Sequence, residues 1–499
     1  MAATTVSGSG AADDGGADDG ASTLDIADMQ GLVARAFGQL SVARYLLLGV
    51  TDAASARRWL ASVIDDVSTA ADRPDNDTTP CLNVAFTWAG LRALGLSPDA
   101  LATFPRPLQE GMVTDHRSRI LGDDGVNEPG SWRWGGPTKP EIHLVVMLYA
   151  ADGPALDEEH ARRRAAFEAD HALEEVSAAI DGAVLDNRGT EHFGFADGLS
   201  QPAMKGWPRK TRSVQPAAEP PPPKWTEVNP GEVVLGHEDN FGKPSAGPTV
   251  AAATDRGHHL GHPSWVPRGR RHLGQGGTYM VVRQLAQDVA GFRRFVQSGR
   301  PADDPDLLAA KLVGRWPSGA PLVLAPEHAD PALAGTNDFG YHVDQDGLSC
   351  PLGAHIRRSN PRDSSVEHPE RARKSNRNHR ILRRGRSYGR PLIEPPATPD
   401  EAADAERGLV FICLNADIER QFEFVQHTWL GNPYFAGLYG EVDPIMGNRP
   451  EGGSFSWPAN PVRRQVTGLP TFVTVKGGGY FFLPGIATLR YLAALKPDA

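Results

Sequence analysis

The strand-like stretch GTYMVVRQL at residues 277–285 has a near copy, GLVFICLN, at residues 408–415. Each begins with a glycine and runs into a segment with helical features that closes on Phe-Val-Gln, at residues 295–297 and 424–426. Two strand–helix units of this kind suit the two halves of a ferredoxin-like β-α-β-β-α-β domain. The repeat therefore predicts an α+β fold in which an antiparallel sheet is covered on one side by helices.

The first half of the chain permits the same architecture. Residues 45–50 (YLLLGV) and 143–150 (HLVVMLYA) are apolar runs with the length of buried strands. Asp52 is placed to cap a helix that extends to Val67. Residues 82–94 repeat the helical spacing, and Gly95 is placed to end that helix. We therefore expect two ferredoxin-like domains in a dimeric α+β barrel-like arrangement.

The domain boundaries follow from shifts in composition. Residues 1–23 are small, polar and acidic, which predicts a disordered tail. The proline-rich run at 216–223 cannot form a helix interior or a central strand. It predicts a linker at 207–231 between an N-terminal domain at 24–206 and a C-terminal domain at 232–499.

Length, charge and cysteine content exclude several classes of protein. A chain of 499 residues should hold about two to three domains. Its three cysteines are too few and too scattered for a disulfide framework, and its net charge of −10 argues against a nucleic-acid partner. No apolar run approaches the length of a membrane span, and no signal peptide is visible, so we expect a cytoplasmic protein. The oligomeric state is left open.

The stretch CPLGAHIRRSNPRD at residues 350–363 carries a single histidine, His355, followed by Arg357, Arg358 and Arg362. Neutral imidazole is the commonest protein ligand of transition metals, including the iron of haem. Arginine forks suit carboxylates such as the two haem propionates. This pattern is what a haem-binding surface needs, although a lone histidine is more often an ordinary structural or surface side chain.

A second informative stretch is EHFGFADGLSQP at residues 191–202. The simpler interpretation of Asp197 and Gly198 is an Asp-Gly turn. In the functional interpretation, the glycines let the backbone approach a flat ligand on which Phe195 packs. Asp197 then points into a largely apolar pocket, where burial raises the pKa of a carboxyl. Such a group can relay a proton between the two oxygens of a peroxide.

A third stretch, HRILRRGRSYG at residues 379–389, ends a basic run that begins near Arg371. For residues 371–377, a solvated basic loop and a functional basic site explain the sequence equally well. The neighbouring Ile381 and Leu382 argue that Arg380, Arg383 and Arg384 are partly buried, and a buried guanidinium needs an anion. Heterolysis of a peroxide needs such a fixed positive charge.

Five motifs in order resemble the dye-decolourising (DyP-type) haem peroxidases: GFADGLSQP, CPLGAHIRRSNPRD, HRILRRGRSYG, GLVFICLNADIERQFEFVQ and VKGGGYFFLPG. The resemblance runs from about residue 26 to residue 495. It implies two ferredoxin-like domains, with haem b (iron protoporphyrin IX) held mainly by the second. It also implies His355 as the proximal iron ligand and metal site, Asp197 as the distal acid/base, Arg383 as the distal arginine and Arg362 as a propionate partner.

The resemblance further implies a carboxylate that orients the proximal imidazole. We prefer Glu423 over Asp417 for this role and also expect Phe195, Gly198 and Arg380 at the cofactor. Many family members carry a distal asparagine two residues after the arginine, where this chain has Gly385.

The expected function is peroxidation with H₂O₂, in which phenols, aromatic amines or dyes are oxidised by one-electron steps. Tyr388, Trp429 and Tyr434 are candidate electron relays by neighbourhood, although core packing explains each as well. The alternatives are a non-catalytic haem protein, an enzyme that acts on porphyrins (porphyrinogen oxidation or iron release from haem), and an Asp/His hydrolase without a cofactor. A non-catalytic haem protein needs no ionisable pair on the distal side, so Asp197 and Arg383 discriminate between it and a peroxidase.

Overall fold

A computed structural model of the chain describes residues 24–71, 78–185, 189–207, 226–298, 304–365, 367–391, 406–449 and 451–496. The acidic tail predicted at 1–23 and the proline-rich run at 216–223 lie outside the described residues.

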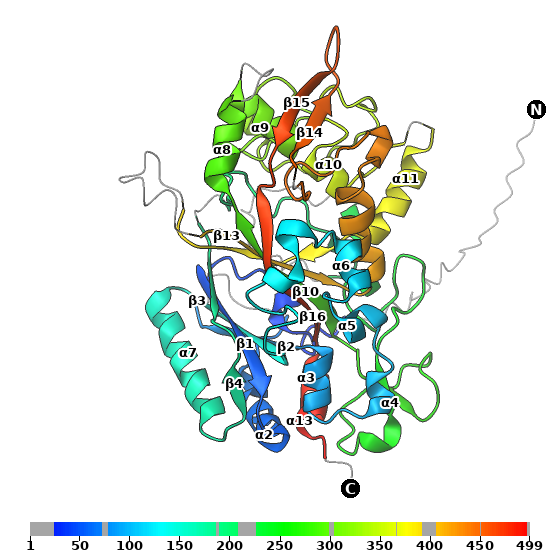
Figure 1. Cartoon of the computed structure of the whole chain (residues 1–499). Coiled ribbons are helices and arrows are strands. Elements are labelled where there is room, and N and C mark those ends of the chain that lie inside the picture. Colours follow the sequence, from blue (N-terminus) through cyan, green and yellow to red (C-terminus); the bar gives the residue numbers. More distant parts are fainter. Residues whose placement is uncertain are drawn as a thin grey trace, which may run out of the picture.

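A 10-stranded antiparallel sheet forms the centre of the molecule, in the order β10-β16-β2-β3-β1-β5-β12-β13-β11 with β4 paired to β1. Because β10 also pairs with β13, the sheet closes on itself as a barrel (Figure 1). Its strands are β1 Val42–Val50, β2 Cys81–Phe86, β3 Leu144–Ala150, β4 Leu173–Glu175, β5 Ile180–Ala183, β10 Thr278–Gln287, β11 Leu382–Arg383, β12 Arg386–Tyr388, β13 Gly408–Asn415 and β16 Val473–Leu483. Smaller pairs are β6 Ala203–Met204 with β7 Glu227–Val228, β8 Thr249–Ala251 with β9 Arg270–His272, and β14 Gly453–Trp457 with β15 Arg464–Leu469.

The two repeated stretches are neighbours in this barrel. Strands β10 and β13 pair antiparallel, from Tyr279 opposite Asn415 to Ala286 opposite Gly408. The prediction that residues 277–285 and 408–415 are strands is therefore confirmed. The segment after β10 is helix α8, and the segment after β13 forms π-helical turns at Glu419–Glu423 and Val425–Leu430.

The barrel has two seams where the N-terminal and C-terminal halves meet. Strands β2, β3, β1 and β5 come from the first half, and β16, β10, β13 and β12 from the second. Each seam is one residue pair wide: Phe86 opposite Phe482, and Ala183 opposite Ser387. The hydrophobic core nevertheless spans both halves, because side chains of both contribute to each of its two large clusters.

Both faces of the central strands are buried, which explains their continuous apolar sequences. On β1, Tyr45 and Leu47 belong to one cluster, whereas Leu46 and Leu48 belong to the other. The cluster that contains Leu46 and Leu48 also contains Trp59 of α2, so this face of β1 lies under the helices. The alternation follows from the two-residue period of a strand.

The helices gather at the two ends of the barrel. Helices α2, α3, α7 and α13 lie at one end, whereas α8 to α11 and the β14–β15 hairpin lie at the other (Figure 1). Helix bounds are α1 Gly31–Ala34, α2 Ala53–Val63, α3 Trp88–Ala93, α4 Pro98–Leu101, α5 Arg106–Glu110, α6 Asp115–Leu121, α7 Gly153–Glu168, α8 Val289–Ser298, α9 Pro305–Val313, α10 His355–Ser359, α11 Pro369–Asn376 and α13 Ile486–Ala493. Within the described ranges, every helix is too short or too polar to cross a membrane.

The prediction of a single helix over residues 82–94 is wrong for the first half of that range. Strand β2 ends at Phe86, and Thr87 then caps α3 by accepting a hydrogen bond from the backbone of Gly90 at 3.0 Å. The predicted cap at Asp52 is confirmed, since its carboxylate accepts from the backbone nitrogen of Ser55 at 2.8 Å.

Candidate active site

His355 opens the short helix α10 and is fixed by a buried carboxylate. Its Nδ1 lies 3.0 Å from both oxygens of Asp443, which is fully buried and also accepts from the backbone nitrogens of Ile445 and Met446. Burial opposes the charge on both partners, but their mutual attraction outweighs it. The pKa of His355 is therefore raised and that of Asp443 lowered. With Nδ1 engaged, Nε2 is the ring nitrogen left for a ligand.

The carboxylate beside His355 is Asp443, so the predicted preference for Glu423 is wrong. Glu423 instead accepts from the Tyr480 hydroxyl at 2.7 Å and from Arg117 at 2.6 Å. Asp417 accepts from the backbone of Arg420, at the start of the π-helical turns. Asp443 lies in an irregular segment far along the chain from His355, where no helical or strand period could have placed it.

Asp197 and Arg383 form an ion pair, as the sequence predicted. Arg383 ends the short strand β11 and donates to Oδ1 of Asp197 at 2.6 Å. The backbone nitrogen of Gly198 donates to the same oxygen at 2.6 Å. Gly198 has a φ of 79°, a conformation that glycine adopts without strain. None of the hydrogen bonds found among the described residues uses Oδ2 of Asp197, which is therefore the oxygen available for chemistry.

The pKa of Asp197 is shifted opposite to the prediction. Burial is the largest single influence and raises this pKa, as expected from the sequence. The charge of Arg383, the hydrogen bonds from Gly198 and Arg383, and the charge of His355 together outweigh burial, so the pKa is lowered. Asp197 is therefore ionised at neutral pH and can accept a proton.

Two residues that the sequence did not single out hold this pair in place. Glu191 accepts from the backbone nitrogens of Phe193 and Phe195, at 2.9 and 3.0 Å, and so fixes the loop that carries Asp197. Burial raises the pKa of Glu191 to about 7. Gln201 pairs with the backbone of Arg383 through both ends of its amide. Both lie in or beside the quoted motif, but their role depends on backbone contacts that a sequence pattern does not show.

Phe195 is buried and packs edge-on against Phe292, with ring centroids 6.4 Å apart. Its ring thus belongs to the core beneath the loop, and contact of Phe195 or Gly198 with a cofactor stays a prediction.

His355 lies near the Asp197–Arg383 pair. The charges of Asp197 and Arg383 both act on the pKa of His355, and that of His355 acts on Asp197. The three side chains are enclosed by protein, yet Asp197, Arg383 and His355 keep 39%, 30% and 28% of their side-chain surface accessible. Side chains that are enclosed but accessible line an internal space. The arrangement therefore brings an imidazole and a carboxylate–guanidinium pair to the same space.

A cluster of arginines adjoins the same space. Burial and the nearby charges of Arg362 and Arg383 lower the pKa of Arg380 to about 9, and burial lowers the pKa of Arg362 to about 10. Arg315 is affected in the same way by burial, Arg362 and Arg383. Among the described residues, Arg380 donates only to Ser200. Mutually repelling buried guanidiniums are stabilised by an anion, and a dicarboxylate suits them.

The two arginines directly after His355 have a different role from the one predicted. Arg358 is fully buried and donates to the carbonyl oxygens of Gly353, Trp429 and Asn432. Arg357 donates in the same way to the carbonyl oxygens of Asp344 and Cys350. These guanidiniums fix the loops around α10. Arg362 also donates to the carbonyl oxygens of Asn337 and Phe339, at 2.9 and 2.8 Å, but of the three it is the one whose charge acts on Arg380.

The candidate electron relays differ in exposure. Tyr388 and Trp429 are buried, and the Tyr388 hydroxyl donates to Glu406 at 3.0 Å. Tyr434 is exposed and packs edge-on against Tyr439. A relay role for any of them stays a prediction.

Gly385 cannot be replaced by asparagine without a change in the backbone. A Cβ atom at this position would lie 2.5 Å from the carbonyl oxygen of Val410 on the adjacent strand. Gly385→Asn is therefore expected to lower the free energy of unfolding by about 1–3 kcal/mol, as overpacking usually does. Chemical denaturation measures this, with Gly261→Asn as the control because Gly261 has open space around it. Equal stability of the two variants would contradict the prediction.

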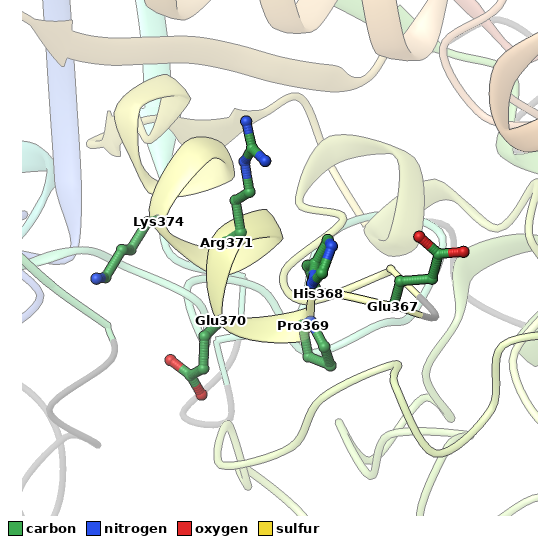
Figure 2. A pocket seen from close by; sticks show the side chains of 6 residues that line it. All are labelled: Glu367, His368, Pro369, Glu370, Arg371 and Lys374. Carbon is green, nitrogen blue, oxygen red and sulfur yellow. The ribbon is translucent and has the colours of Figure 1, made fainter.

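The surface hollow at the start of α11 is not this site. It has a volume of about 510 Å³ and is lined by Glu367, His368, Pro369, Glu370, Arg371 and Lys374. Figure 2 shows that the charged side chains diverge from one another. Residues 371–376 lie in α11, so the interpretation of residues 371–377 as a loop is wrong, whereas Arg371 and Lys374 are exposed to solvent.

Comparison with known proteins identifies the family. The family model described as Dyp-type peroxidase, C-terminal, matches residues 336–435. The chain is 31% identical over 502 residues to a dye-decolorizing peroxidase of Mycena epipterygia, covering 90% of this chain and 84% of the relative. The chain belongs to the DyP-type peroxidase family. This peroxidase is also 30% identical to a multifunctional dye peroxidase of Amycolatopsis sp., covering 90% and 91% of the two chains.

The fold agrees with this assignment. The crystal structure of a fungal DyP-type peroxidase from Auricularia auricula-judae superposes with a TM-score of 0.73 at 26% identity, covering 95% of this chain and all of that one. The chain is thus a dye-decolourising peroxidase, and peroxidases of this family are haem enzymes.

Proposed function

We propose that this peroxidase uses haem b and H₂O₂ to oxidise phenols, aromatic amines and dyes by one-electron steps. The observation that carries the proposal is the Asp197–Arg383 ion pair, which lies near His355, with part of the surface of all three side chains accessible. A phenolic substrate class is supported by a solved dye-decolorizing peroxidase, 26% identical to this chain, in complex with 2,6-dimethoxyphenol.

The residues around the space fit haem b. His355 offers Nε2 for the iron, while Asp443 holds Nδ1 and so increases the basicity of the ring. Arg362 and Arg380 offer positive charge for the two propionates. Haem, when bound, supplies the redox chemistry, and the protein sets its ligation, surrounding charge and access.

The ionised Asp197 acts on the peroxide as a proton carrier. Its Oδ2 accepts the proton of one peroxide oxygen and returns it to the other, so that the departing oxygen leaves as water. Arg383 stabilises the negative charge that develops on that oxygen. The hydrogen bond from Gly198 to Asp197 and the hydrogen bonds between Gln201 and the backbone of Arg383 hold the two groups in place, so little reorganisation accompanies the transfer.

The same proposal interprets each half of the barrel as a ferredoxin-like unit. In the first half the chain order is β1, α2, β2, β3, α7 and then β4 and β5, with α3 to α6 inserted between β2 and β3, and β1 and β3 are the central strands. In the second half β10 and β13 are central, flanked by β16 and β12. This order matches a split β-α-β-β-α-β motif.

Four measurements test the proposal: the absorption spectrum, the reaction with H₂O₂, dye or phenol turnover, and an assay of porphyrin products. The haem-loaded protein should show a Soret band and should react with H₂O₂ in a stopped-flow experiment. It should then turn over a dye or a phenol without altering free porphyrins. Haem binding without any reaction with H₂O₂ would favour the non-catalytic alternative, and modified porphyrin products would favour the porphyrin-directed one.

The pKa shift of Asp197 predicts the pH profile. A lowered carboxyl pKa keeps Asp197 ionised into the acidic range, so the rate constant for H₂O₂ should stay level from pH 7 to about 5. Arg383→Leu removes the charge that opposes burial, so the pKa of Asp197 should rise and the acid limb should move to higher pH. Stopped-flow rate constants normalised across pH measure this, with the exposed Arg390→Leu as control. An unmoved acid limb in Arg383→Leu would contradict it.

A further inference from the structure

A second hollow, of about 240 Å³, lies between the segment that leads into α10 and the β14–β15 hairpin. We call it the hairpin pocket. Its walls include Leu352, Leu438, Trp457 and Val462, and Arg463 stands among its lining residues. It is distinct from the internal space between His355 and Asp197, because none of the residues assigned to that site lines it.

The size and walls of the hairpin pocket suit one aromatic ring. An apolar cavity of roughly 150 Å³ is enough to bind benzene, so this volume accommodates a ring with one or two substituents. Val462 is strongly exposed, and so is Tyr439, which follows the lining residue Leu438 in the chain. The rings of Tyr439 and Tyr434 pack edge-on, with their centroids 5.3 Å apart. Exposed apolar side chains around a hollow are typical of a ligand-binding site. The exposed Arg463 adds a cation that favours a ligand with an anionic substituent.

The pocket is connected to the iron ligand by a short path. Leu352 precedes His355 by three residues, so their Cα atoms are at most about 11 Å apart. The ring of Trp457 lies 5.9 Å from that of Phe455, measured between centroids. A Cβ placed on Gly353 would lie 3.4 Å from the ring of Phe455, so this ring packs against the backbone next to Leu352. Aromatic rings and a few covalent bonds therefore link the pocket to the imidazole.

We propose that the hairpin pocket binds single-ring phenols that carry a carboxylate and that these are oxidised there. The inference rests on the proposed peroxidase function. Each bound phenol gives one electron through Trp457, Phe455 and the backbone to the peroxidase centre and releases its phenolic proton to solvent. Two phenols are oxidised to phenoxyl radicals for each H₂O₂ reduced, and their two electrons and two protons account for the two waters formed.

Binding is tested without peroxide, by calorimetric titration of the haem-loaded protein with 4-hydroxybenzoate. Loss of a charged hydrogen bond in Arg463→Glu should weaken binding about tenfold or more. The same variant should bind neutral 4-hydroxybenzamide as the wild type does. Arg464→Glu makes the same charge change one residue along, outside the pocket lining, and serves as the matched control. Ala459→Trp fills the pocket and should weaken binding of both ligands.

Electron transfer is tested separately. Trp457→Phe keeps the wall but removes the indole, so kcat for 4-hydroxybenzoate should fall while the rate constant for H₂O₂ stays unchanged. Failure of the wild type to react with H₂O₂ would refute the proposed function and leave the binding result standing. Unchanged affinity for 4-hydroxybenzoate in both Arg463→Glu and Ala459→Trp, with folding confirmed by circular dichroism, would overturn the pocket as a reductant site.

Discussion

Asp197→Asn is expected to slow the reaction with H₂O₂ by about 10²–10⁴-fold, the usual effect of removing a general acid–base group. The asparagine amide has nearly the same shape but cannot accept and return a proton. It can still accept hydrogen bonds from Arg383 and Gly198, which use Oδ1 in the wild type. The loss should therefore appear in the chemical step, and the Soret band should show that haem is retained. Stopped-flow measurement of the bimolecular rate constant gives the result.

The matched control for this variant is Asp346→Asn, which neutralises an exposed carboxylate in the segment before α10. Its rate constant should equal that of the wild type. Arg383→Leu should also be slow, because the charge on the departing oxygen then has no guanidinium beside it. An unchanged rate constant in Asp197→Asn would mean that another group carries the proton, and the proposed role of Asp197 would be wrong.

The sheet could be predicted from the sequence because its signal is local. The repeated stretches at 277–285 and 408–415 are mostly apolar and are followed by helical segments, as strands buried on both faces are. The seams could not be predicted, since each depends on one residue pair between distant strands. Residues 82–94 misled the prediction because Val84, on strand β2, happens to lie at helical spacing from Trp88 and Leu91 on α3.

The candidate active site also has features that the sequence could predict and features that it could not. His355, Asp197 and Arg383 each stand in a compact motif, so they could be found without knowing which segments meet. The pKa of Asp197 could not be predicted from its own neighbours, because burial alone gives the wrong sign and the largest opposing charge comes from Arg383 on the distant strand β11. Likewise, the sequence does not show that Arg357 and Arg358 donate to backbone carbonyls rather than to a ligand.

Asp443→Asn is expected to weaken haem binding or activity by about 10–100-fold, as is usual when the partner of a metal-ligating histidine is lost. The asparagine carries no charge, so the pKa of His355 should fall and its imidazole should donate less electron density to the iron. Less donation stabilises the ferrous form relative to the ferric form. The midpoint potential of the iron should therefore become more positive, which spectroelectrochemical titration measures together with the rate of haem loss to apomyoglobin.

Glu423→Gln separates this electronic effect from a general loss of packing. Glu423 is as deeply buried as Asp443 and holds Arg117 and Tyr480, so its replacement should lower stability through that network. It has no hydrogen bond to His355 among those of the described residues, and the midpoint potential should therefore stay near that of the wild type. A shift in potential in Glu423→Gln but not in Asp443→Asn would return the orienting role to Glu423. Equal shifts in both would show that the potential follows the packing of the surrounding segment rather than the carboxylate on Nδ1.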